Sequence, residues 1–303
     1  MAKRALLLVN RLSRSGDADL SAAVGCLRAA GLDVTPFATE RPQDIPTLIR
    51  AHRCRVDLVI VGGGDGSMNA AAAAVLEIGV PMAVLPLGTA NDLARTLGIP
   101  SALEEACAVA ANGLRHRIDL GEVNGKHFFN VASIGLSVAV ARMIDAETKR
   151  RWGAAGYALT VVKALREHRP FRVRIRCDGR FLQLRSIQIA VGNGRHYGGG
   201  LTVASDAAID DYMLDLYSIG PAGLLRLALL APALRTGRHG EFEGVHLLRG
   251  RHIELETSRP MPVNTDGEVT THTPAVFRTL PGALEMMVPA AFVEASGEAD
   301  AAE

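Results

Sequence analysis

The feature that most constrains this chain is a pair of apolar runs, each ended by a turn of small polar residues. The first run, Val56 to Val61, is rich in β-branched residues and stops at Gly62-Gly63-Gly64-Asp65-Gly66-Ser67. An alanine-rich helical stretch follows, and a second apolar run stops at Pro86-Leu87-Gly88-Thr89-Ala90-Asn91. Alternating strands and helices predict a parallel sheet flanked by helices. Open sheets of this kind bind ligands at the carboxyl ends of their strands, where both turns are expected to lie.

The first turn has the chemistry of an anion site. Glycines let main-chain N–H groups approach an anion closely, and the positive end of the following helix adds to the attraction. Asp65 is unusual there, because a carboxylate repels phosphate unless a divalent cation lies between them. The alternative is a plain glycine-rich turn with a capping aspartate. No Lys follows the glycines as in a Walker A loop, and Ser67 stands where a dinucleotide fingerprint has its third glycine.

Together, Gly63 to Ser67 and Pro86 to Asp92 resemble the catalytic domain of diacylglycerol kinases, and within that superfamily the bacterial YegS-like lipid kinases. Sphingosine and ceramide kinases are relatives, and NAD kinases and phosphofructokinases share a more distant GGDG turn. The resemblance runs essentially end to end. It implies an ATP-dependent, Mg²⁺-dependent lipid kinase, which transfers the γ-phosphoryl group of ATP to a lipid hydroxyl. ATP is expected between two domains.

The resemblance also implies a set of nucleotide-binding residues. They are Asn10, Thr39, Gly64, Asp65, Gly66, Ser67, Met68, Asn69, Ala70 and Thr89. Two positions depart from the family: Arg11 replaces the proline of an NPxxG-like loop, and Ala70 replaces the glutamate of the GDGTxNE signature. Taken singly, the hydroxyl and amide side chains are equally typical of helix caps and loops. Asp92 and Asp119 match carboxylates that hold water and metal around the site, with simple helix caps as the alternative.

The second half contributes a candidate base. Asp266-Gly267-Glu268 alone is typical of a hairpin turn. In diacylglycerol-kinase-like enzymes a DGE motif supplies the carboxylate that accepts the proton of the lipid hydroxyl, and Glu268 matches it. Phosphoryl transfer needs positioning, charge neutralisation and a group that orients the nucleophile. Glu268 and Asp65 are therefore the two predicted catalytic residues.

A magnesium site is implied further along the chain. In the family, main-chain oxygens and one carboxylate hold the ion, and the matching positions are Ala208, Asp211 and Met213. Hard cations accept carbonyl oxygens, so apolar residues at two of these positions are no objection. Tyr212 follows Asp211 where the family has glycine, which puts the local turn geometry, and so this metal site, in question.

The pattern along the chain indicates two domains. Strand and helix alternate up to Ile118, and Ser101 to Glu104 has the sequence of a capping box. Hairpin signatures at Asn124-Gly125 and Asp178-Gly179 then indicate antiparallel strands. We expect an α/β nucleotide-binding domain with a parallel sheet (1–120), of the NAD-kinase and diacylglycerol-kinase type. A mainly antiparallel β-sandwich domain for the lipid (121–293) and a disordered tail (294–303) would follow.

Composition excludes several other classes. The net charge is +1 and aromatic residues make up 4%, which argues against a nucleic-acid partner. The four cysteines form no CxxC pair and indicate reduced thiols, not zinc ligands or disulfides. No apolar run is long enough for a signal-peptide core or a transmembrane helix. We therefore expect a cytoplasmic protein that visits the inner membrane surface, with homodimer formation left open.

Some questions stay open at this level. Arg172, Arg174 and Arg176 alternate along a strand and indicate either a solvated sheet face or, with Lys149 to Trp152, a contact with anionic lipid head groups. Diacylglycerol is the default acceptor, and phosphatidylglycerol or a sphingoid base is an alternative. Two other functions remain: an NAD kinase, or a catalytically impaired regulatory protein that only binds nucleotide. Asp65 and Glu268 argue against impairment, and DGE with PLGTAND favours the lipid kinase.

Overall fold

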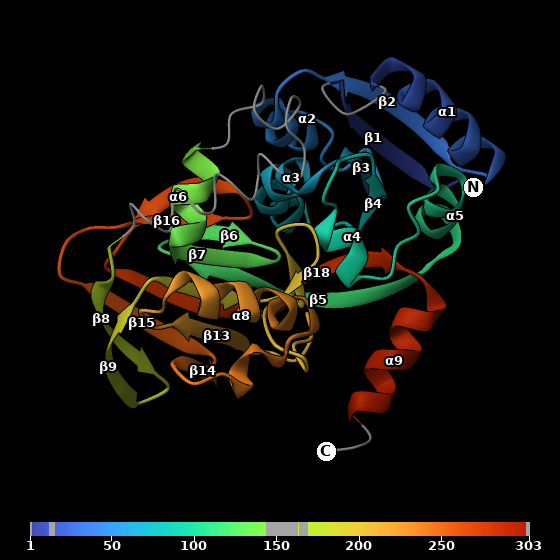
Figure 1. Ribbon diagram of the computed structural model, residues 1–303. Coiled ribbons are helices and arrows are strands. Elements are labelled where there is room, and N and C mark those ends of the chain that lie inside the picture. The colour runs from blue at the N-terminus through green and yellow to red at the C-terminus, as the bar shows by residue number, and fades with distance from the viewer. Residues whose placement is uncertain (1, 12–15, 144–162, 164–168, 301–303) are drawn as a thin grey trace.

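The computed structural model describes residues 2–11, 16–143, 163 and 169–300, and its two structural regions lie side by side (Figure 1). The first region is built on four parallel strands in the order β2-β1-β3-β4. These strands are β1 (Arg4–Asn10), β2 (Asp33–Thr39), β3 (Leu58–Gly63) and β4 (Met82–Pro86). β3 and β4 are buried along their whole length, as expected for a parallel sheet covered on both faces.

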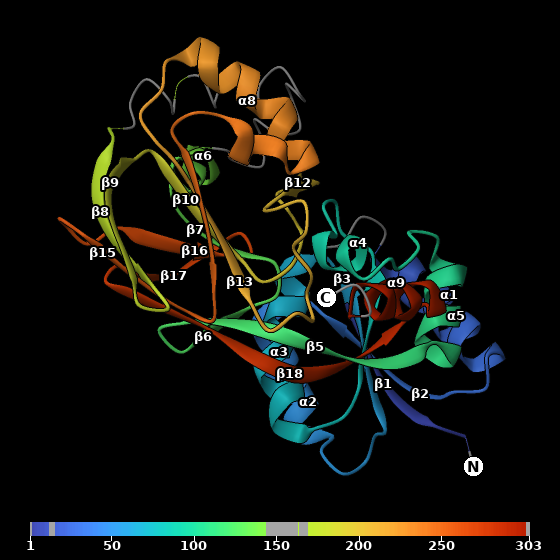
Figure 2. The same ribbon diagram turned by 90° about the horizontal axis from the view of Figure 1, so that it is seen from below.

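Helices cover this parallel sheet in two pairs. The helical segments are α1 (Gly16–Ala29), the 3₁₀ turn η1 (Pro42–Asp44), α2 (Ile45–Ala51), α3 (Asp65–Ile78), α4 (Asp92–Thr96) and α5 (Leu103–Asn112). α1 packs with α5 and α2 with α3, and Figure 2 shows the two pairs on opposite sides of the sheet. α5 begins near the expected position, but Ala102 is its N-cap residue and no side chain caps the helix. The predicted capping box is therefore wrong, although the helix is present.

Two long antiparallel strands, β5 (Leu114–Val123) and β18 (Ala275–Val288), join the first region to the second. β18 pairs with β4 through Met286 and Met82, and its other end pairs with β15. The result is one ten-stranded sheet with the main order β2-β1-β3-β4-β18-β15-β8-β9, to which β5 and β6 are joined at β18. The expected domain boundary at 120 and 121 falls inside β5, so that division stays a proposal.

The second region is a sandwich. One layer is the far part of the ten-stranded sheet: β6 (Lys126–Phe128), β8 (Phe171–Cys177), β9 (Arg180–Ser186) and β15 (His252–Thr257). The other is a six-stranded antiparallel sheet in the order β14-β13-β10-β7-β16-β17. Its strands are β7 (Val131–Gly135), β10 (Gln188–Gly192), β13 (Leu214–Ile219), β14 (Val245–Gly250), β16 (Pro262–Thr265) and β17 (Glu268–His272). Alternating apolar residues of both layers form a common core, as in Phe171, Val173, Ile175 and Cys177 of β8.

Shorter elements surround the sandwich. They are α6 (Leu136–Met143), β11 (His196–Tyr197), β12 (Leu201–Thr202), α8 (Leu224–Thr236) and the 3₁₀ turn η2 (Arg238–Glu241). Leu230 of α8 joins a small core with Tyr217 and Ile219 of β13, so this helix covers the outer face of the six-stranded sheet (Figure 2). Within the described residues, no helix combines the length and the apolar character needed to cross a membrane.

The fold class expected from the sequence is confirmed. Both hairpin turns are present, with positive φ at Asn124, Gly125, Asp178 and Gly179. The disordered tail is a wrong prediction for residues 294–300, because α9 (Ala290–Asp300) is a helix. Phe292 and Val293 pack against the first core and explain why the helix docks there. The Lys149 to Trp152 segment and residues 301–303 lie outside the described residues.

Candidate functional site

The first glycine turn joins β3 to α3 through glycines, which have no side chains. Gly64 is the N-cap residue, and its carbonyl accepts the N–H groups of Ser67 (2.9 Å) and Met68 (3.3 Å). A Cβ at Gly63 would lie 2.9 Å from the Cβ of Ser67, so a side chain at this position would collide with that serine. The amino end of α3 therefore stays open toward a ligand, with the charge preference of a helix N-terminus.

The second glycine turn packs directly on the first. A Cβ on Gly88 would overlap the backbone of Gly64, and the N–H of Leu87 donates to the carbonyl of Gly63 at 3.1 Å. Asn91, at φ 51°, holds this turn through hydrogen bonds with Gly88 N (3.0 Å) and Gly88 O (3.0 Å). Sequence reasoning did not single out Asn91. Its signal is the tolerance of asparagine for left-handed backbone and for bonding to its own turn.

Asp65 ties the two turns together. Its carboxylate accepts the N–H groups of Asp92 (3.1 Å) and Leu93 (3.0 Å), which are the first two residues of α4. The side-chain amide of Asn130 also approaches Asp65 Oδ1, at 3.5 Å. A carboxylate oxygen has two lone pairs, so these bonds leave Asp65 able to face a cation.

Asp92 connects α4 to the sandwich region. Both of its carboxylate oxygens accept the N–H of Gly199, at 3.1 and 2.9 Å, in the loop between β11 and β12. Burial raises the pKa of Asp92, the bond from Gly199 opposes that shift, and the nearby charge of Asp65 adds to it.

Asp119 of β5 holds two further loops. It accepts the N–H of Gly282, in the bulge of β18, at 2.7 Å, and the N–H of Tyr212 from the loop before β13. Burial raises the pKa of this carboxyl group as well.

Asp266 is a site residue that sequence reasoning treated only as part of a motif. It sits in the turn between β16 and β17, at φ 47°. Its carboxylate accepts three consecutive main-chain N–H groups, from Phe129 (2.7 Å), Asn130 (3.0 Å) and Val131 (3.0 Å). Loss of hydration raises its pKa to about 7, the three N–H groups oppose this, and the charge of Asp65 adds to it. The bonds connect the turn that carries Glu268 to Asn130, and so to Asp65.

We call Asp65, Asp92, Asp119 and Asp266 the central carboxylates, because they share one property. Each accepts main-chain N–H groups, and within the described part of the chain none forms an ion pair. No side-chain cation in that part of the chain therefore neutralises the group, while burial raises the pKa of Asp92, Asp119 and Asp266. Two deeply buried amide oxygens, Oδ1 of Asn130 and of Asn193, also lack a donor among the described residues. Such orphaned acceptors suit water around a divalent cation. The described residues offer no cluster of three or more His, Cys, Asp or Glu side chains for a metal, so they fit Mg²⁺ bound through one or two carboxylates, waters and nucleotide phosphates.

The predicted nucleotide-binding residues come from the ends of β1 and β2, from the two glycine turns and from the first turns of α3. Asn10 and Thr39 are register partners at the ends of β1 and β2, and the amide of Asn10 reaches Ser67 Oγ at 3.4 Å. The structure thus brings Asn10 to the first glycine turn. Thr89 is exposed on the second turn, whereas the side chain of Met68 lies in the core at 1% exposure and leaves only its main chain for a ligand. Gly66, Asn69 and Ala70 are partly exposed along the first turns of α3.

Glu268 is exposed at the first position of β17, two residues after the anchored Asp266. The arginine strand is also exposed, but Arg174 pairs with Glu256 (2.7 Å) and Arg176 with Glu254 (3.1 Å) of β15. Both ion pairs favour the solvated-face interpretation for these two arginines.

The implied magnesium residues lie in the loop before β13, where Arg249 approaches Asp211. Asp211 Oδ2 accepts the N–H of Ala208 (3.2 Å), and Oδ1 accepts that of Met213 (2.9 Å). The guanidinium of Arg249 also donates to Asp211. Tyr212 keeps the left-handed backbone expected for glycine, at φ 63°. The structure brings Ala208, Asp211 and Met213 together in one turn, and a magnesium site at these residues stays a prediction.

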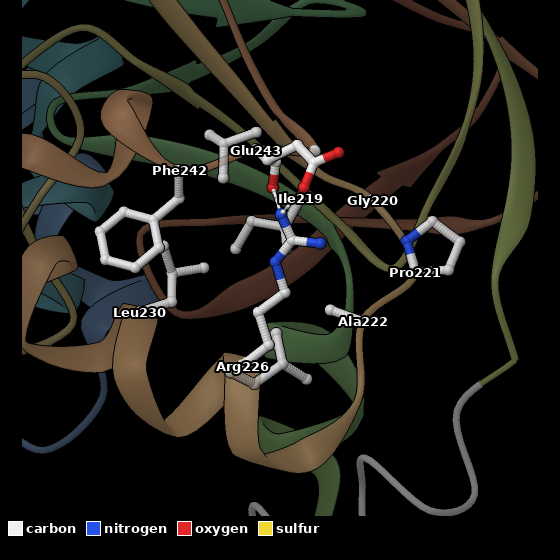
Figure 3. Close-up of a pocket in the computed structure, with 11 residues that line it drawn as sticks. Ile219, Gly220, Pro221, Ala222, Arg226, Leu230, Phe242 and Glu243 are labelled. Atoms are coloured by element: carbon white, nitrogen blue, oxygen red, sulfur yellow. Dashed lines mark hydrogen bonds and ion pairs between the residues drawn. The ribbon is translucent and has the colours of Figure 1, made fainter.

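A small pocket lies elsewhere, between the end of β13, α8 and the loop that follows η2 (Figure 3). Arg226 crosses it to the main-chain oxygen of Glu243, and Leu230 and Phe242 line its apolar side. None of the predicted site residues lines this pocket, so it is separate from the central carboxylates.

Comparison with known proteins agrees with this geometry. The model of the diacylglycerol kinase catalytic domain matches residues 4–123, and that of the YegS C-terminal NAD kinase beta sandwich-like domain matches residues 130–288. A Pseudomonas aeruginosa protein named "Probable lipid kinase YegS-like" is 34% identical over 299 residues, or 96% of each chain. A Bacillus subtilis "Diacylglycerol kinase" is 29% identical over 264 residues, which cover 86% of this chain and 87% of that one.

Solved structures lead to the same family. The crystal structure of a diacylglycerol kinase from Bacillus anthracis str. Sterne aligns with a TM-score of 0.80 at 29% identity, covering 95% of this chain and 98% of that one. Two family models match in chain order, and a relative 34% identical spans nearly the whole chain. The chain therefore belongs to the diacylglycerol kinase catalytic-domain family, in its YegS-like lipid kinase branch.

Proposed function

We propose that this protein is an ATP-dependent kinase that phosphorylates the hydroxyl of a diacylglycerol-like lipid, with Mg²⁺ bound together with the nucleotide. One observation carries the proposal: the amino end of α3 packs on the second glycine turn beside Asp65, Asp92 and Asp266, which form no ion pair among the described residues. Phosphates suit the N–H groups at such a helix end, and a divalent cation would offset the carboxylates. The kinase relatives support the same reading.

In this proposal the nucleotide meets the first region. Main-chain N–H groups from Gly64 to Ser67 bind its phosphates, with Asn10, Thr39 and Thr89 around them. Asp65 and its neighbouring carboxylates hold Mg²⁺, which when bound neutralises charge on the transferred phosphoryl group. Domain 1–120 would thus serve ATP and domain 121–293 the lipid, at the inner surface of the membrane.

Glu268 acts as the general base in this proposal. Its exposure leaves the carboxylate accessible to an incoming lipid, and the three bonds to Asp266 fix the turn on which it stands. Glu268 takes the proton of the lipid hydroxyl as that oxygen bonds to the γ-phosphorus, and the bond to the β,γ-bridging oxygen breaks to release ADP.

The direct test is transfer of labelled phosphate from ATP to a lipid panel in mixed micelles, with NAD as a further acceptor. We expect labelled lipid from the wild type. In Glu268→Gln we expect turnover to fall by about 10²–10⁴-fold with nucleotide affinity unchanged. Glu256→Gln, an exposed ion-paired glutamate, is the matched control and should retain activity.

Other outcomes identify the rival functions. Efficient phosphorylation of NAD without any lipid product would make the protein an NAD kinase. Tight nucleotide binding without transfer to any acceptor would make it a regulator. Near wild-type turnover in Glu268→Gln would remove Glu268 from the role of base.

A further inference from the structure

A second group of acidic residues lies around one arginine. Arg249 of β14 donates from Nη2 to Asp211, while its Nη1 lies 3.5 Å from Asp206 Oδ2 and its Nε 3.7 Å from Asp215 Oδ1. Arg249 and Asp215 are also register partners across β13 and β14, so the sheet itself holds the guanidinium here. We call these four residues the Arg249 cluster.

The Arg249 cluster occupies the place where the family resemblance implies magnesium. Mg²⁺ requires close octahedral coordination by oxygens at about 2.0–2.1 Å. Here Oδ2 of Asp211 accepts the guanidinium of Arg249, which places a positive charge where the ion would bind. A magnesium ion would have to displace Arg249, which is held by two further carboxylates. Among the described residues, no group of three or more His, Cys, Asp or Glu side chains has the arrangement of a metal site.

We propose that Arg249 replaces the magnesium ion at this loop and that the chain is stabilised there by its own side-chain cation. The guanidinium suits this role because its planar fork of N–H donors can serve several carboxylates at once. The replacement of the ion by Arg249 also explains how the loop keeps its shape although Tyr212 has a left-handed backbone conformation. The main-chain N–H of Tyr212 reaches Asp119, so Arg249 braces a loop that supports one central carboxylate.

The replacement makes a specific chemical prediction. Removal of the guanidinium leaves Asp206, Asp211 and Asp215 without their shared cation, so that a divalent cation can approach Asp211. The wild type should therefore lack metal at Asp211, whereas Arg249→Ala should acquire it. This inference does not depend on kinase activity, because it concerns only metal bound without nucleotide.

The test is Mn²⁺ binding to the full chain without nucleotide, measured by electron paramagnetic resonance of the free ion. We expect Arg249→Ala to bind one Mn²⁺ per chain more than the wild type. The double variant Arg249→Ala/Asp211→Asn should lose that extra ion. Arg174→Ala, which breaks a cross-strand ion pair on the other sheet, should bind as the wild type does.

Asp211→Asn alone keeps the experiment decisive if Arg249→Ala does not fold. This variant retains Asp206 and Asp215 as partners of Arg249, and its Mn²⁺ stoichiometry should equal that of the wild type. Loss of a bound ion in Asp211→Asn would show that the metal is already present beside Arg249 and would overturn the proposal. Failure of a folded Arg249→Ala protein to gain an ion would overturn it too.

Discussion

The central carboxylates and the Arg249 cluster each contain several aspartates, but the two groups differ in what holds the carboxylates. Both concentrate aspartates at the ends of strands and turns. Among the described residues the central carboxylates are held by main-chain N–H groups without a side-chain cation, whereas Asp206, Asp211 and Asp215 share a guanidinium. Amide dipoles orient a carboxylate without neutralising it. The difference separates a region prepared for an external cation from one that contains its own.

The largest expected effect tests this contrast directly. Asp65→Asn should lower turnover by about 10²–10³-fold, because charge at the transferred phosphoryl group is no longer balanced through a metal. Asp211→Asn removes a carboxylate of similar burial but should leave turnover within a few-fold of wild type. Steady-state turnover of both variants, measured at a series of Mg²⁺ concentrations, checks the two expectations. Equal losses of turnover in the two variants would contradict the difference between the central carboxylates and the Arg249 cluster.

Asp266 tests the stabilising role of the main-chain bonds. Asp266→Ala strips the partner from three N–H groups, and the free energy of unfolding should fall by about 3 kcal/mol. Asp178→Ala is the matched control, since that exposed turn aspartate also accepts two main-chain N–H groups but water can replace it. Urea denaturation of both variants gives the comparison. A smaller loss for Asp266 than for Asp178 would contradict it.

Local features of both regions follow from sequence, whereas their long-range partners do not. Glycine turns, hairpins and the DGE motif are short patterns with a direct backbone cause. By contrast, Asp119 and Gly282 are 163 residues apart, and nothing near Asp211 points to Arg249. The prediction of a disordered tail is wrong for residues 294–300 for the same reason. Its alanine-rich composition resembles disorder, and only the distant core that receives Phe292 and Val293 makes the helix stable.

A smaller effect is expected at Tyr212. A non-glycine residue in the left-handed region is destabilised by about 1–2 kcal/mol. Glycine relieves this strain, but it also loses more backbone entropy on folding, which offsets part of the relief. Tyr212→Gly should therefore raise the free energy of unfolding by about 0.5–1 kcal/mol. Tyr212→Ala retains the Cβ and should bring no such gain. A destabilised Tyr212→Gly would mean that the tyrosine side chain itself stabilises the Arg249 cluster.

The smallest effect concerns an arginine–aspartate pair on the surface, an exposed counterpart of the Arg249 cluster. Hydrogen bonds from Arg4 lower the pKa of Asp57 from 3.8 to about 2. A carboxyl group with a lowered folded-state pKa contributes stability above its ordinary pKa and loses it as the pH falls through the folded value. The stability difference between wild type and Asp57→Asn should thus shrink between pH 3.8 and about pH 2. Denaturation at stepped pH measures it, and a pH-independent difference would disprove the coupling.

The pairing of β18 with β4 has a consequence for synthesis of the protein. The parallel sheet takes its neighbour on the β4 side from residues 275–288, which leave the ribosome after the whole sandwich sequence. Until then the nascent first region presents an unpaired strand edge, which is a template for association with other chains. The β4 edge of the amino-terminal half is therefore covered only when the carboxyl-terminal strand arrives.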